Sequence, residues 1–168
     1  MVLVKRFPLS LIAAILLTVT GLAGLARGTE PTATAADAAA SQGSQGPIVV
    51  SGAYVREPAN GINAAAYFTL SNTTDAAESL TAVTSGAGAL TTLHTDSMRQ
   101  SAALTIPARG SVTLSPGKGH VMIEKLYGPL KAGQSVNFQL TFAKSGQLLL
   151  TAPVIAVTAP APTAQAPR

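Results

Sequence analysis

Residues 135–142 read Ser-Val-Asn-Phe-Gln-Leu-Thr-Phe, with polar and apolar side chains in strict alternation. Successive side chains of a strand point to opposite faces, so this pattern places all four apolar residues on one face. The stretch therefore predicts a β-strand that covers a hydrophobic core on one side.

Similar stretches recur through the central region, separated by turn residues rich in Gly, Pro, Asn and Asp. The predicted strands cover residues 48–55, 65–70, 79–84, 89–93, 111–114, 120–126 and 147–157. Pro153 lacks an amide hydrogen, which predicts an edge or a bulge in the last strand. No apolar stripe at helical spacing is present. Short strands joined by such turns are typical of a sandwich, and we predict an all-β sandwich of about seven to nine short strands.

The N-terminal region has the three parts of a secretory signal peptide. Lys5 and Arg6 precede an apolar run that extends from Leu9 to Ala26 and ends in small residues. The run approaches the length that spans a bilayer, so an uncleaved membrane anchor is the alternative. We expect an exported protein, in the periplasm or at the cell surface of a bacterium, with no other membrane contact. The chain has no cysteine, so neither a disulfide nor the thioether lipid of bacterial lipoproteins is available.

Composition divides the chain into four parts. We predict residues 1–26 as the signal peptide or anchor, 27–46 as a flexible Ala/Thr/Ser-rich linker, 47–157 as the β-sandwich and 158–168 as an Ala/Pro-rich disordered tail. The two flanking segments have no periodicity with which to bury a face.

Several function classes are absent from the sequence pattern. The formal net charge is +4, but four of the 11 Lys and Arg residues lie near the ends, and no basic cluster interleaved with aromatics indicates a nucleic-acid partner. There is no Gly-x-Ser-x-Gly elbow, phosphate-binding loop or dinucleotide fingerprint, so we do not expect an enzyme. A blue-copper electron-transfer site is excluded because it requires a cysteine thiolate.

The candidate functional residues are two pairs of histidine and methionine. The chain has only two histidines and three methionines, one of them the initiator. Met98 follows His94 by four residues, and Met122 follows His120 by two, which places the second pair on one face of a predicted strand. Two imidazoles and two thioethers form a soft, neutral donor set, and soft sulfur donors favour Cu(I).

Other interpretations of these residues stay open. A single Met commonly fills a gap in a core. Asp96, together with His94 and His120, would form a harder set suited to Zn(II) or Cu(II), although an Asp in a turn commonly bonds its own backbone. A secreted β-sandwich adhesion or binding module, with the His/Met pairs incidental, is the alternative from another functional class.

The central region, from about Val50 to Val157, resembles the PCu(A)C family of copper chaperones. The resemblance rests on residues 53–56 (AYVR), 63–72 (NAAAYFTLSN), 106–108 (IPA), 116–117 (PG), 120–122 (HVM), 128–133 (GPLKAG) and 140–142 (LTF). The family's metal motif is a His, ten residues, a Met, twenty-one residues and His-x-Met. Met98 and the segment 120–122 fit this motif, whereas only three residues separate His94 from Met98.

The resemblance implies a cupredoxin-like Greek-key sandwich with His94, Met98, His120 and Met122 as Cu(I) ligands. It also implies delivery of copper outside the cytoplasm to the CuA centre in the copper subunit of cytochrome c oxidase, or to another copper chaperone. The short connection either preorganises His94 and Met98 or holds Met98 out of reach. We expect four ligands, because the interval from Met98 to His120 is retained.

Overall fold

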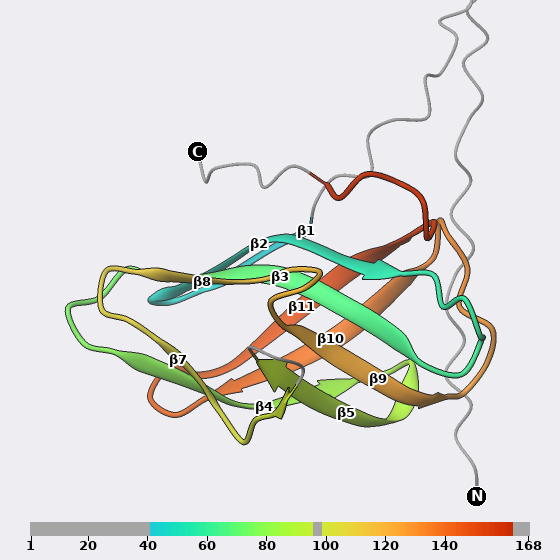
Figure 1. Cartoon of the computed structure of the whole chain (residues 1–168). Helices are drawn as coiled ribbons and strands as arrows, with labels where there is room; N and C mark the ends of the chain where they lie inside the picture. The colour runs from blue at the N-terminus through green and yellow to red at the C-terminus, as the bar shows by residue number, and fades with distance from the viewer. Residues whose placement is uncertain (1–40, 96–98, 163–168) are drawn as a thin grey trace, which may run out of the picture. The chain divides into compact units, whose positions relative to one another are not determined.

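The computed structural model describes residues 41–95 and 99–162, and this part of the chain is all β (Figure 1). Its strands are β1 (Ser41–Gln45), β2 (Ile48–Arg56), β3 (Ala64–Asn72), β4 (Glu78–Ser85), β5 (Gly88–Thr95), β6 (Arg99–Gln100), β7 (Leu104–Ile106), β8 (Ser111–Leu114), β9 (His120–Leu126), β10 (Ser135–Phe142) and β11 (Gly146–Ile155). No helix within these residues is long and apolar enough to cross a membrane. The proposed signal peptide or anchor lies outside them.

The strands form two layers that are joined into one curled sheet. The hydrogen-bonded order is β6-β5-β9-β3-β2-β11-β10-β4-β7, with β1 paired to β2 and β8 paired to β3. Strand β11 belongs to both layers: it runs antiparallel to β10 as far as Pro153, and Val154 and Ile155 then pair in parallel with β2. Pro153 therefore lies where the strand passes from one layer to the other. The predicted all-β sandwich is confirmed.

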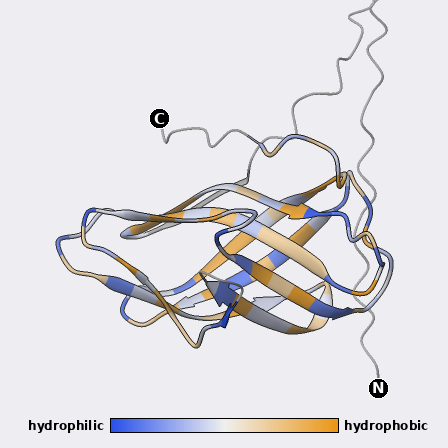
Figure 2. Ribbon diagram, viewed as in Figure 1, coloured by the Kyte–Doolittle hydropathy of each residue, from blue (hydrophilic) through white to orange (hydrophobic). Residues whose placement is uncertain are grey.

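The core lies between the layers and follows the alternation in the sequence. The four apolar residues of β10 are all at most 5% exposed, as the pattern predicted. Strand β3 supplies Ala64, Ala66, Phe68 and Leu70 to the same core. In Figure 2 hydrophobic residues alternate with more polar ones along the strands, and hydrophilic residues also occupy several turns. Burial of apolar surface is the main stabilising contribution to such a core.

Three short strands were not predicted. Strand β1 lies in the segment that we expected to be a linker, and it pairs antiparallel with β2. Strands β6 and β7 have two and three residues. None of the three carries an extended apolar alternation, so the periodicity that marks the other strands is missing.

One turn brings the two histidines together. Strand β3 pairs with β8 along its second half and with β9 along its first, and residues 115–119 connect β8 to β9. A Cβ atom on Gly119 would lie 2.8 Å from the carbonyl oxygen of His94, so only glycine permits this approach between the backbones. Immediately after Gly119, His120 enters β9 directly opposite His94.

Candidate metal site

His94 and His120 are register partners at one end of the antiparallel pair β5 and β9. Their ring centroids are 4.8 Å apart, with an angle of 49° between the ring planes. Directly opposite residues of neighbouring strands project from the same face. The structure thus brings together two of the predicted ligands that lie 26 positions apart in the sequence.

Met122 lies on the same face as His120, two residues further along β9. Its cross-strand neighbours are Thr92 on β5 and Ala65 on β3. The alternate residues of β9, Val121 and Ile123, are fully buried in the core. The face that carries His120 and Met122 is therefore the outer face of its layer.

His120 is nevertheless buried, with 5% of its surface exposed. Its Nε2 atom is fully buried and has no hydrogen-bond partner among the described residues. Burial, and to a smaller extent the neighbouring His94, lower the pKa of the His120 imidazole below its ordinary value. At neutral pH the ring is neutral, and it can offer a lone pair to an electrophile.

His94 is partly exposed and has a polar partner. Its Nε2 atom lies 3.3 Å from the hydroxyl of Thr92, which donates a hydrogen bond of 2.8 Å to the carboxylate of Glu124. The three side chains lie on the outer face of β5 and β9. The two histidines thus differ, since only His94 has a hydrogen-bond partner among the described residues.

Two tyrosines continue the row of rings across the sheet. The Tyr67 ring lies 6.3 Å from that of His120, and the Tyr54 ring lies 5.1 Å from that of Tyr67. Burial, followed by the charge of Tyr54, raises the pKa of the Tyr67 phenol.

Sequence reasoning assigned no site role to Thr92, Glu124, Tyr54 or Tyr67. Thr92 and Glu124 each lie an even number of residues from a predicted ligand on the same strand, and strand periodicity could have indicated them. The tyrosines come from β2 and β3, and their position depends on strand pairing that the sequence pattern does not specify.

Asp96 and Met98 lie outside the described residues. Their neighbours in the chain are Thr95 and Arg99, which are register partners in the β5–β6 hairpin. Within residues 41–95 and 99–162 there is no cluster of three His, Cys, Asp or Glu residues able to hold a metal ion. A Zn(II) site of the harder type would therefore depend on Asp96.

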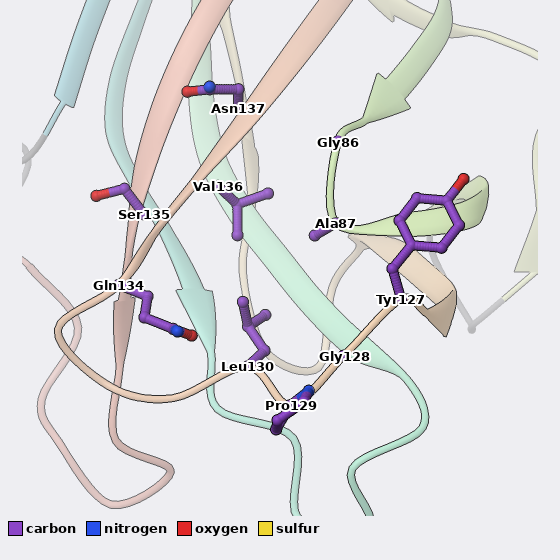
Figure 3. A pocket seen from close by; sticks show the side chains of 10 residues that line it. All are labelled: Gly86, Ala87, Tyr127, Gly128, Pro129, Leu130, Gln134, Ser135, Val136 and Asn137. Atoms are coloured by element: carbon purple, nitrogen blue, oxygen red, sulfur yellow. The ribbon is translucent and has the colours of Figure 1, made fainter.

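One cavity lies away from the histidines. It has a volume of about 530 Å³, and Leu130 and Val136 point toward one another across it (Figure 3). It adjoins Ala87 and Tyr127, next to the end of the β5–β9 pair that is opposite to His94 and His120. Of the predicted ligands, the three that the structure describes, His94, His120 and Met122, do not line it.

The family described as putative lipoprotein LpqE-like matches residues 48–154. The chain belongs to the LpqE-like family. No curated protein matches this LpqE-like chain.

Solved structures resemble it over most of their length. The copper-bound PCuAC domain from PmoF2 is 25% identical, with a TM-score of 0.63, over 68% of this chain and 97% of that one. CuI-DR1885 from Deinococcus radiodurans is 34% identical, with a TM-score of 0.58, over 74% of this chain and 86% of that one. Apo-DR1885 is 32% identical, with a TM-score of 0.55, over 80% and 97%. The predicted PCu(A)C resemblance and the cupredoxin-like β fold are confirmed.

The described part of the candidate site offers two imidazoles and one thioether. His94, His120 and Met122 lie on one face, and they carry no negative charge that would favour a hard divalent ion. This donor set is suited to a soft, weakly charged cation.

Proposed function

We propose that this chain is an extracytoplasmic, non-enzymatic Cu(I)-binding metallochaperone. Its ligands are His94, His120, Met122 and Met98. The observation that carries the proposal is the buried Nε2 atom of His120, which has no partner among the described residues and belongs to a ring 4.8 Å from that of His94. The copper-bound relatives support the choice of metal.

The energetics of His120 favour a ligand. A buried polar atom without a partner costs about 1–3 kcal/mol, and a metal bond to the lone pair removes that cost. A metal ion competes with a proton for the imidazole lone pair. The lowered pKa of His120 reduces that competition. Thioethers bind Cu(II) weakly, so Met122 favours the monovalent ion.

Met98 completes the proposed ligand set. It precedes Arg99, the register partner of Thr95, so a connection of only three residues joins the two strands of this hairpin. A short connection has little entropy to lose when both of its ends bind one ion. Met98→Ala and Met122→Ala should lower the Cu(I) affinity to a comparable extent, and an unchanged affinity in Met98→Ala would leave three ligands.

Delivery follows from the proposed location of the protein. We assign residues 1–26 to export or anchoring, 27–46 largely to a linker and 158–168 to a tail. An exported Cu(I) carrier would transfer its ion to the CuA-type centre of a respiratory oxidase or to another copper chaperone. This step is tested by mixing the loaded protein with a purified CuA domain. The absorption of the CuA centre measures how much copper is transferred.

Binding is tested by titration of the purified protein with Cu(I) in competition with a chromogenic chelator. We expect one Cu(I) per chain, with little competition from Zn(II). Tight Zn(II) binding without Cu(I) binding would favour the set of His94, Asp96 and His120. If both histidines can be changed to alanine without loss of any metal affinity, an adhesion or binding module becomes the better account.

A further inference from the structure

A second row of side chains lies beside the proposed ligands on the outer face of β5 and β9. Thr92 precedes His94 by two residues, and Glu124 follows Met122 by two. The Thr92 hydroxyl is 2.8 Å from Oε1 of Glu124 and 3.3 Å from Nε2 of His94. A chain of two hydrogen bonds thus connects a carboxylate to one of the two imidazoles.

The number of available hydrogens determines which group donates in each of these two hydrogen bonds. A threonine hydroxyl has one hydrogen and two lone pairs, and an ionised carboxylate can only accept. Thr92 therefore donates its hydrogen to Glu124 and accepts one from Nε2 of His94. A neutral imidazole has a single N–H group, so when Nε2 carries the hydrogen the lone pair is on Nδ1.

We infer that Thr92 and Glu124 are positioning residues that hold His94 in the Nε2–H tautomer and present its Nδ1 atom to the metal. The inference rests on the proposed Cu(I) function. It distinguishes the two histidines, because the unpartnered buried atom of His120 is Nε2. The ion would thus be held by Nδ1 of His94 and Nε2 of His120.

The same two hydrogen bonds connect a negative charge to a ligand set that carries none. Imidazole and thioether ligands bring no negative charge, so a bound Cu(I) ion would leave a net positive charge at the site. The carboxylate of Glu124 would offset part of that charge through Thr92. Hydrogen-bond partners of metal-binding histidines typically change metal affinity by about 10–100-fold.

Thr92→Val tests the inference, since valine keeps the branched shape and removes the hydroxyl. Thr92→Ser restores the hydroxyl, and Glu124→Gln removes the charge. Thr91→Val is the matched control, because Thr91 is the adjacent residue of β5 and points to the opposite face. Thermal unfolding of each variant establishes that the sandwich is retained.

The first measurement is the side-chain ¹H–¹⁵N NMR spectrum of the metal-free protein at alkaline pH. We expect His94 as the Nε2–H tautomer in the wild type, Thr92→Ser and Thr91→Val, and as a mixture in Thr92→Val. A wild-type His94 in the Nδ1–H tautomer, or a Thr92→Val spectrum unchanged from the wild type, overturns the inference.

The second measurement is Cu(I) affinity by chelator competition, with the ¹⁵N spectrum of the loaded protein. We expect a loss of about 10–100-fold in Thr92→Val and a smaller loss in Glu124→Gln. Coordination of wild-type His94 through Nε2 contradicts the inference. The tautomer is measured without copper, so a wild type that has the expected tautomer but fails to bind Cu(I) refutes the proposed function alone.

Discussion

Glu78 and His120 are both buried polar side chains, with 4% and 5% of their surfaces exposed, but their surroundings differ. The Glu78 carboxylate accepts four hydrogen bonds of 2.6–3.2 Å, from the amides of Ser79, Lys144 and Ser145 and from the hydroxyl of Ser145. Nε2 of His120 accepts none from the described residues. Buried polar groups in native proteins are nearly always paired.

The difference separates a structural group, Glu78, from a proposed metal ligand, His120. Glu78 connects the start of β4 to the turn between β10 and β11. Asn72 has a similar role: its side-chain amide donates to the carbonyl oxygens of Ala76 and Pro107 and accepts from the backbone amide of Thr74. Burial alone would raise the pKa of the Glu78 carboxyl, but its hydrogen bonds outweigh burial and lower that pKa. His120 has a lowered pKa without such bonds, as we expect for the neutral metal ligand that we propose.

The largest expected effect is on copper binding. His120→Leu replaces the imidazole with an apolar group of similar size. Loss of a hydrogen-bond partner of a metal ligand lowers metal affinity by up to about 100-fold, and we expect the loss of the ligand itself to lower the Cu(I) affinity further. Chelator competition measures the change. Glu78→Gln is the matched control at the other buried polar site, and its Cu(I) affinity should equal that of the wild type.

The second effect is on stability, and here we expect the loss at Glu78 and not at His120. Glu78→Gln replaces an acceptor of four hydrogen bonds with a neutral amide, and hydrogen bonds to charged groups are typically worth about 1.5–3 kcal/mol. We expect the free energy of unfolding to fall by about 2 kcal/mol in urea denaturation. A variant as stable as the wild type would mean that Glu78 is not the structural counterpart described above.

A smaller effect is expected for the metal-free form of His120→Leu. Removal of an unpartnered buried polar atom relieves its desolvation cost, so we expect the free energy of unfolding to rise by about 1 kcal/mol. Urea denaturation in the presence of a Cu(I) chelator measures it. A loss of stability would indicate that His120 contributes to the fold and would weaken the contrast with Glu78.

The smallest effect is a pH dependence. The pKa of Glu78 in the folded protein is below its ordinary value of 4.5, so its stabilising contribution is complete above that value and is lost as the pH falls through the folded pKa. Glu78→Gln should remove this part of the acid destabilisation. Urea midpoints measured between neutral and acidic pH test it, and parallel curves for the two proteins would contradict it.

The sequence predicted the main strands because their apolar residues alternate. Strands β8, β9 and β10 have the bounds that were expected, whereas β1, β6 and β7 lack the pattern. The face shared by His120 and Met122 follows from strand periodicity, but the pairing of His94 with His120 depends on register and on the space left by Gly119. Neither is encoded in local spacing, so the convergence of the two histidines could not be derived.

A structure of the protein loaded with one equivalent of Cu(I) tests the central claim most directly. We predict an ion bonded to Nε2 of His120, to His94 and to the sulfur of Met122, with Met98 as the fourth ligand, and with Glu78 and its hydrogen bonds unchanged. An ion bound elsewhere, with Nε2 of His120 still without a partner, would contradict the account.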